Sequence, residues 1–310
     1  MSLPYLFVAG TPYSGSTLLS FLLDAHPDCV CLGEINGLTA DVVPEEYRCS
    51  CGRPFLACEF WNGIAARMQE LGSPIDLRCA EWVTEFRAFE NRYLNHVCIG
   101  PLQSGALDTL RDLALAPLLA LRGGLARGGL ANAALARAAL DATGASVFAD
   151  ATKSPQRIRF LARTPGLDLR VVHLVRDARG GVASYMKNAS ASVERAARQW
   201  VLRNRMADRA RRYVPTGGWL VVRQSDLCDD VQGTMDRIAD FARLRRAAVP
   251  AELRPREHHI VGNRMRLADR ITVRSDDSWR DTLGEDGLRT VARICGPLNR
   301  SFGYAWPTQA

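Results

Sequence analysis

The sequence contains very little lysine. Of its 40 basic residues only Lys153 and Lys187 are lysines, and the others are arginines. A GC-rich genome explains this bias without any functional preference, but the rarity makes each lysine worth testing for a role. Runs of like charge are also missing, so we expect no nucleic-acid partner. The net charge of +7 favours acidic partners in general.

Long hydrophobic runs are missing as well. No apolar stretch reaches the roughly 18 residues that a membrane-spanning helix needs, so we expect no stable membrane insertion. The chain enters the strand-like run "PYLFVAG" without the basic and apolar segments of a secretory leader, and we therefore expect an unprocessed cytoplasmic protein. The nine cysteines are an odd number, which indicates reduced thiols rather than a disulfide framework. Four of them stand alone: Cys79, Cys98, Cys228 and Cys295.

Short apolar runs alternate with helical patterns along the chain. The strand-like runs cover residues 5–9, 146–149, 169–175 and 219–223. The helical patterns cover 16–25, 80–95, 154–162, 179–187, 193–213 and 281–299. This alternation predicts an α/β fold with a doubly wound, mainly parallel sheet flanked by helices. Such sheets bind ligands beyond the carboxyl ends of their strands, and the loop after the first strand is such a place.

The stretch 107–140 is rich in Ala, Leu, Gly and Arg and has a helical period. We expect breaks in it at Pro117 and at two Gly-Gly pairs. We interpret residues from about 60 to 145 as a mostly helical insertion within a single domain spanning 1–310. A lid or a wall of the acceptor site is the alternative role.

The first strand leads into "GTPYSGST" at residues 10–17, which nearly matches the phosphate-binding pattern G-x-x-x-x-G-K-[ST]. Ser16 stands where that pattern has lysine. Glycines let the backbone N–H groups of such a loop converge, and the following helix adds its positive end, so the loop can bind a phosphate without side-chain charge. Without the lysine it is poorly suited to a nucleoside triphosphate. A plain strand–helix turn is the alternative.

A second candidate site lies in "LVRDARGGVASY". Arg176 stands at a strand end, where a guanidinium can fork onto a phosphate. Ser184 lies about two turns along the next helix, where its hydroxyl can share that phosphate. The alternative is a structural arginine that pairs with Asp177.

Several motifs in this order resemble sulfotransferases that use 3′-phosphoadenosine 5′-phosphosulfate. They are "GTPYSGSTLLSFLLDAHPD", "GE" at 33–34, "DATKSP", "LVRDARGGVASY" and "GNRMR" at 262–266. The resemblance is greatest to bacterial members with a Y-S-G-S-T first loop and a C-x-C-G…C-x-F-W segment, here "CSCGRPFLACEFW". It extends from residue 5 to about residue 306, nearly the whole chain.

This resemblance implies how the phosphosulfate donor, the co-substrate, would be bound. The residues expected at the 5′-phosphosulfate are Tyr13, Ser14, Gly15, Ser16 and Thr17. The residues expected at the 3′-phosphate, or in a loop that closes over the nucleotide, are Arg176, Ser184, Asn263, Arg264 and Arg266. Tyr13 departs from the family, because many members carry Lys or Arg there and tyrosine brings no charge.

The resemblance also implies the chemistry, an in-line transfer of a sulfuryl group to an acceptor hydroxyl. Glu34 would be the base that takes the acceptor's proton, and Lys153 would stabilise the leaving phosphate oxygen. A surface glutamate and a surface lysine are the alternatives. The expected acceptor is a small molecule or glycan: a sugar, a lipid-linked glycan or a secondary metabolite. No metal is expected to be required.

Three other functions stay open. A tyrosyl peptide is the alternative acceptor, because Glu34 and Lys153 also resemble positions of tyrosylprotein sulfotransferases. A P-loop kinase is a rival, with Asp150 organising Mg²⁺ for ATP. A nucleotide-binding module without catalysis is the third.

The segment "CSCGRPFLACEFW" places Cys49, Cys51 and Cys58 close together. A zinc site usually has four ligands with C-x₂₋₄-C spacing, which these three do not provide unless Cys79 completes the set. We therefore expect no metal ligands here. We interpret these cysteines instead as plain packing or as a redox-sensitive disulfide.

Overall fold

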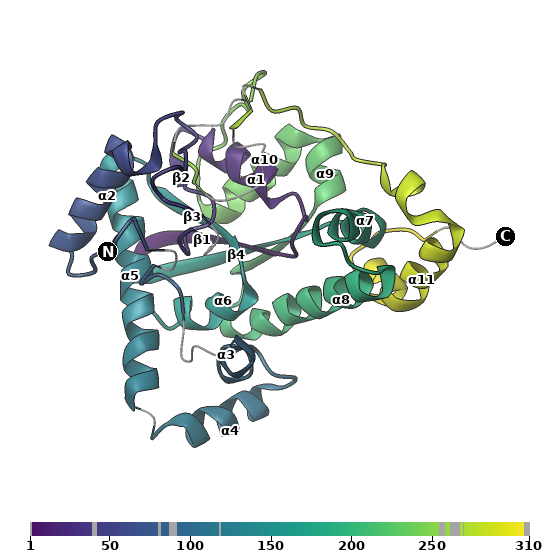
Figure 1. Cartoon of the computed structure of the whole chain (residues 1–310), viewed down its shortest axis with the longest axis horizontal. Helices are drawn as coiled ribbons and strands as arrows, with labels where there is room; N and C mark the ends of the chain where they lie inside the picture. Colours follow the sequence, from purple (N-terminus) through teal and green to yellow (C-terminus); the bar gives the residue numbers. More distant parts are fainter. Residues whose placement is uncertain are drawn as a thin grey trace.

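The computed structural model describes residues 2–38, 42–79, 82–86, 92–117, 119–253, 258–260, 267–268 and 270–306. Within them, one parallel five-stranded sheet has the order β2-β3-β1-β4-β5 (Figure 1). Its strands are β1 (Leu3–Gly10), β2 (Cys29–Cys31), β3 (Val147–Lys153), β4 (Leu167–Val175) and β5 (Trp219–Arg223). The predicted α/β fold with a parallel sheet is confirmed. The short strand β2 escaped prediction because three residues carry too little apolar pattern.

Helices cover both faces of this sheet, as expected for parallel strands. Alternate side chains of β1 point to opposite faces. Tyr5 and Phe7 belong to a core that includes side chains of α2 (Glu59–Glu70), α5 (Leu119–Thr143) and α6 (Pro155–Leu161). Leu6 and Val8 belong to a core shared with α1 (Ser16–Asp24), α9 (Gln224–Asp229) and α10 (Val231–Ala242). Because β1 is central and packed on both faces, the loop at its end has a rigid base.

A third cluster of buried side chains lies beyond β4. It joins Val175 to three helices: α7 (Ala178–Ala189), α8 (Val193–Ala210) and α11 (Trp279–Ser301). Figure 1 shows these helices together at one end of the molecule. Two short 3-10 turns, η1 (Phe55–Ala57) and η2 (Arg211–Tyr213), also lie in the described part of the chain.

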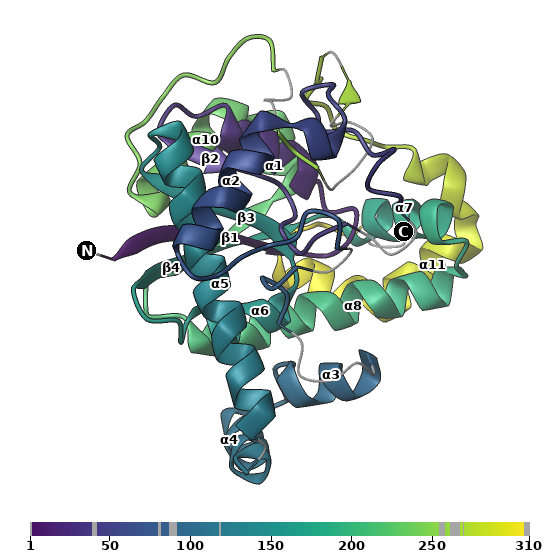
Figure 2. The same ribbon diagram turned by 60° about the vertical axis from the view of Figure 1, so that its left-hand side comes forward.

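The segment between β2 and β3 is mostly helical where it is described. It contains α2, α3 (Arg92–Ile99), α4 (Gly105–Leu115) and α5, and Figures 1 and 2 show α3 and α4 away from the sheet. The helix predicted over 80–95 is wrong for 82–86, which form turns around the buried Trp82 and Phe86. The predicted break at Pro117 is confirmed, because α4 ends before it and α5 begins after it. The single-domain assignment stays a prediction.

The two Gly-Gly pairs do not break α5, contrary to the prediction. A Cβ on Gly129 would lie only 2.4 Å from Thr164 Oγ1, and one on Gly128 would lie 3.0 Å from Phe86 Cδ1. The second pair therefore lets α5 approach its neighbours closely, and this packing offsets the low helix propensity of glycine. None of the helices in the described part of the chain combines the length and apolarity needed to cross a bilayer.

Candidate active site

The carboxyl ends of all five strands contribute residues to one edge of the sheet. The loop 11–15 follows β1, Glu34 lies beyond β2, Lys153 ends β3, Arg176 follows β4 and Gln224 follows β5. A Cβ on Gly15 would lie 3.0 Å from Gln224 Cγ, so the end of β5 abuts the first loop. Gln224 was not expected from the sequence, where nothing distinguishes it from an ordinary helix-starting polar residue.

The first loop has the features of an anion site. Tyr13 and Gly15 both have positive φ, 64° and 91°, which turns the chain sharply into α1. That helix has no side-chain cap and no acidic residue in its first turn, so its positive end is left uncompensated. Ser14 is fully buried, and its Oγ has no hydrogen-bond partner among the residues described. This hydroxyl is therefore available to donate to an anion in the loop.

Glu34 and Lys153 form an ion pair. Lys153 Nζ donates a hydrogen bond to Glu34 Oε1. The Glu34 side chain is 22% exposed and the Lys153 side chain is 18% exposed. The backbone holds this arrangement, because the N–H of Ala151 donates to Gly33 O at 3.0 Å and the N–H of Ile35 donates to Thr152 Oγ1 at 3.2 Å. The structure thus brings together the two residues expected to carry the transfer.

Asp150 faces the protein interior instead of the first loop. It is fully buried; its Oδ1 accepts from Thr152, and its Oδ2 accepts from the Tyr5 hydroxyl at 2.9 Å and from Arg157 at 3.3 Å. Burial raises the pKa of Tyr5 well above its usual value, and the Asp150 carboxylate adds to that shift. Both carboxylate oxygens are engaged by protein donors, which counts against Asp150 as a Mg²⁺ organiser.

Arg176 lies across the start of α7 and reaches the first loop. Its Nη1 donates to Tyr13 O and to Ser184 Oγ, both at 3.0 Å, and its Nη2 donates to Asp276 Oδ2 at 3.1 Å. The Arg176 side chain is 11% exposed. The alternative pairing with Asp177 is wrong, because Asp177 caps α7 through the backbone N–H of Arg179.

Two neighbours fix the position of Arg176. A Cβ on Gly180 would lie 2.8 Å from Arg176 Nε, so glycine leaves room for the guanidinium over the helix. Trp200 Nε1 donates to Arg176 O at 3.2 Å. Asp276 was missed because it stands 100 residues further along, in a loop without a recognisable motif. Hydrogen bonds from Ser278, together with the charge of Arg176, hold the pKa of Asp276 below its usual value.

A cavity opens beside the first loop. Residues from the loop, α7 and α8 line it, among them Thr11, Pro12, Gly181, Tyr185, Trp200 and Arg203. The Tyr13 ring meets the Tyr185 ring edge to face, with centroids 6.0 Å apart. Burial raises the pKa of Tyr13, with a smaller contribution from Tyr185. The cavity is therefore close to both the loop and the helix that carries Ser184.

The loop residues Tyr13, Ser14, Gly15, Ser16 and Thr17 all lie at this strand edge. Asn263, Arg264 and Arg266 lie outside the described residues.

No curated protein sequence matches this chain. Its structure is similar to the sulfotransferase domain of the Synechococcus PCC 7002 olefin synthase, with a TM-score of 0.54 and 19% identity over 99% of this chain and 98% of that one. It is also similar to sulfotransferase STF9 from Mycobacterium avium, with a TM-score of 0.52 and 14% identity over 100% of this chain and 79% of that one. At these identities the likeness shows the fold alone.

The model of a protein family described as "Sulfotransferase family" matches residues 78–247, more than half of the 310-residue chain. The matched part includes Lys153, Arg176 and Ser184 and ends before the late segment 258–266. The first loop and Glu34 precede it. The expected family is thereby confirmed: the chain belongs to the sulfotransferase family.

Proposed function

We propose that this sulfotransferase moves a sulfuryl group from 3′-phosphoadenosine 5′-phosphosulfate to an acceptor hydroxyl. One observation carries the proposal. The first loop, at the end of the central strand β1, has the Glu34–Lys153 pair at the β3 side and the Arg176–Ser184 pair at the β4 side. This edge offers an anion loop, a carboxylate and two separate cations, which is what a donor with phosphates at both ends of its ribose requires.

The first loop suits the 5′-phosphosulfate. The α1 N-terminus and the unpartnered Ser14 hydroxyl supply donors, and Ser16 and Thr17 add hydroxyl groups in the first turn. The loop has no basic side chain, so Lys153 from the neighbouring strand would supply the positive charge. Tyr13 contributes its backbone carbonyl to hold Arg176, and its ring packs against Tyr185, which lines the cavity.

The Arg176–Ser184 pair suits the 3′-phosphate. Arg176 already donates to the Ser184 hydroxyl, so a phosphate that binds both groups meets donors fixed by the fold. Its contact with Asp276 would have to be exchanged for the phosphate, and the half-exposed Asp276 side chain can turn to solvent.

The reaction follows from the same arrangement. The acceptor oxygen attacks the sulfur of the donor in line, the new O–S bond forms, and the bond from sulfur to the 5′-phosphate oxygen breaks. The acceptor's proton passes to a Glu34 carboxylate oxygen. Lys153 Nζ exchanges its hydrogen bond to Glu34 for one to the leaving phosphate oxygen, where negative charge develops. Sulfated acceptor and 3′,5′-bisphosphate leave, and no step requires a metal.

The acceptor we propose is a hydroxyl of a sugar, lipid-linked glycan or secondary metabolite. A tyrosyl peptide is the alternative. The test offers the purified protein radiolabelled phosphosulfate donor together with a cell extract, and then fractionates the extract into glycan, lipid, small molecule and peptide. We expect label in one of the first three fractions, and its loss with Glu34→Gln.

Two outcomes would contradict the proposed sulfuryl transfer, and a third would change only its acceptor. Phosphate transfer from ATP with Mg²⁺, without any sulfate transfer, would indicate the kinase. Tight binding of the 3′,5′-bisphosphate with no label in any fraction would indicate a nucleotide-binding module. Label confined to the peptide fraction would replace the proposed acceptor by tyrosine.

A further inference from the structure

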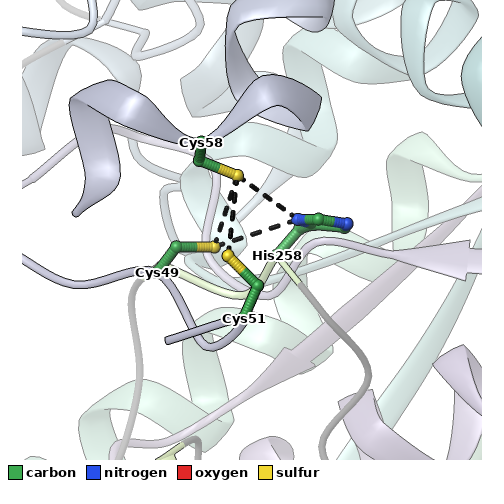
Figure 3. A group of neighbouring side chains, drawn as sticks. All are labelled: Cys49, Cys51, Cys58 and His258. Carbon is green, nitrogen blue, oxygen red and sulfur yellow. Dashed lines mark hydrogen bonds between the residues drawn. The ribbon is translucent and has the colours of Figure 1, made fainter. Parts of the chain in front are cut away.

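Four potential metal ligands converge beside α2. Cys49 and Cys51 lie in the loop after β2, Cys58 directly precedes α2, and His258 comes 200 residues after Cys58. Figure 3 shows the three sulfurs and the imidazole pointing toward a common centre. All four ligand atoms lie within 4.8 Å of one another. The sequence predicts no site here, because Cys79 is the fourth ligand that it offers. In the structure Cys79 is exposed and donates to Asp76 instead.

Four of the six distances between these atoms are close to the edges of a tetrahedron around a metal ion. Cys58 Sγ lies 3.8 Å from the sulfurs of both Cys49 and Cys51, and His258 Nδ1 lies 3.4 Å from Cys58 Sγ and 4.0 Å from Cys49 Sγ. Tetrahedral zinc with Zn–S of about 2.3 Å and Zn–N of about 2.0–2.1 Å separates sulfurs by about 3.8 Å and sulfur from nitrogen by about 3.6 Å. A disulfide would need sulfurs about 2.05 Å apart, and the structure has these cysteines free.

We propose that Cys49, Cys51, Cys58 and His258 bind one structural Zn²⁺. Three thiolates and an imidazole form a soft, tetrahedral donor set of the kind that zinc prefers. Four protein ligands leave no open position for a substrate, so the ion would stabilise the fold and take no part in catalysis. Binding converts the three thiols to thiolates and releases their protons to solvent.

The two cysteine-bearing segments are held in place by the backbone around them. The N–H of Cys49 donates to Arg53 O at 3.1 Å, and the N–H of Gly52 donates to Cys49 O at 2.9 Å, forming a tight turn. Cys49 and Cys58 are 0% and 1% exposed. Cys58 directly precedes α2, which places its sulfur at the N-terminal end of that helix.

His258 is fixed in the same way by α2. Its ring stacks on Phe60 with centroids 4.1 Å apart and an 8° angle between the planes, and its carbonyl accepts from Trp61 Nε1 at 2.8 Å. Its φ of 96° is unfavourable for a residue with a side chain, and such a conformation persists only where surrounding contacts impose it. The imidazole is thus aimed at the sulfurs by packing against protein groups alone.

The zinc site would join distant parts of the chain. Beside it, the N–H of Ser50 donates to His259 O at 3.1 Å, and the His259 ring stacks on Phe21 of α1, the helix that follows the first loop. The ion would therefore tie the described residues 258–260 to the loop that carries Cys49 and Cys51. This zinc site does not rest on the proposed function.

The test measures metal in protein purified without chelator. We expect about one zinc per chain in the wild type, and about one in the matched controls Cys79→Ser and Cys98→Ser, which remove cysteines outside the cluster. Cys58→Ser and His258→Ala should lose most of it. Absence of zinc from the wild type, or retention of a full equivalent in both cluster variants, would overturn the site.

A second measurement keeps the proposal testable if the variants do not fold. Wild-type protein stripped of zinc and titrated with Co²⁺ should show thiolate charge-transfer absorption and the intense visible bands of a tetrahedral site, saturating at one equivalent. Weak octahedral bands, or a mass showing a disulfide among these cysteines, would overturn it. Binding of the 3′,5′-bisphosphate is measured separately, so zinc without bisphosphate binding would refute the proposed function and leave the metal site standing.

Discussion

The cations on the two sides of the first loop, Lys153 and Arg176, differ in how their charges are neutralised. At the β3 side, the transfer pair (Glu34–Lys153) is a closed ion pair in which the carboxylate neutralises the ammonium. At the β4 side, the anchor pair (Arg176–Ser184) joins a guanidinium to neutral acceptors, and among the described residues the half-exposed Asp276 adds a charge. A balanced pair can exchange a proton and a hydrogen bond at little electrostatic cost, whereas a guanidinium whose carboxylate partner is half-exposed and can turn to solvent suits a permanent anion. Changes in the transfer pair should therefore alter rate, and changes in the anchor pair should alter affinity.

The largest expected effect comes from Glu34→Gln, which keeps the shape but removes the base. Turnover should fall about 10²–10⁴-fold, while affinity for the 3′,5′-bisphosphate stays near that of wild type. Steady-state kinetics and calorimetric titration measure the two quantities. Glu46→Gln, on an exposed side chain, is the control. Turnover and a pH–rate profile equal to wild type would remove Glu34 from the mechanism.

Lys153→Met should lower turnover about 10²–10³-fold, the usual effect of removing one donor to developing negative charge. Lys187→Met, the only other lysine of the chain, is the matched control and should leave the rate unchanged. If Lys153→Met weakens bisphosphate binding more than it slows turnover, Lys153 acts in donor binding, as the anchor pair does, and its assignment to the transfer step is wrong.

Arg176→Ala should weaken bisphosphate binding by about tenfold to 150-fold, which corresponds to the 1.5–3 kcal/mol of a charge-assisted hydrogen bond. Turnover at saturating donor should change less. Arg195→Ala, an exposed arginine of α8, controls for the loss of one positive charge. Equal affinity in Arg176→Ala and wild type would refute the 3′-phosphate assignment.

Asp276→Asn should change bisphosphate affinity in the opposite direction to Arg176→Ala. Removing the carboxylate that competes for Arg176 should tighten bisphosphate binding by up to about fivefold, since exposed ion pairs contribute at most about 1 kcal/mol. Asp286→Asn, on an exposed side chain of α11, makes the same change in net charge and should have no such effect. Weaker binding in Asp276→Asn would mean that the carboxylate helps to hold the donor.

His173 acts on the anchor pair only through the fold. Its replacement should therefore change turnover and bisphosphate affinity least at neutral pH. It is buried in β4 beside Asn204, and burial lowers its pKa to about 4. The unfolded chain, with a histidine pKa of about 6.5, takes up this proton earlier, so stability falls as pH drops from about 6.5 toward 4, by about 3 kcal/mol in total. Urea unfolding across this range should show the loss in wild type and a smaller one in His173→Gln. Parallel curves would contradict the burial argument.

Local pattern was enough to predict most of the frame. The strand predicted at 219–223 matches β5, and those at 5–9 and 169–175 lie within β1 and β4, because buried parallel strands are continuous apolar runs. The helix predicted at 80–95 failed over the described residues 82–86, where Trp82 and Phe86 are buried in turns rather than on a helix. The Gly-Gly pairs misled for a related reason, since tertiary packing outweighed propensity in α5.

The sequence by itself determined the sheet class, the first loop and the Arg176–Ser184 spacing, because each depends on residues that are near one another along the chain. Tertiary structure alone decided that Lys153 meets Glu34 across 119 positions, that Asp276 occupies Arg176, that Asp150 points inward and that His258 joins three cysteines. These contacts depend on strand order and on how distant segments pack, and no periodicity in the sequence records either.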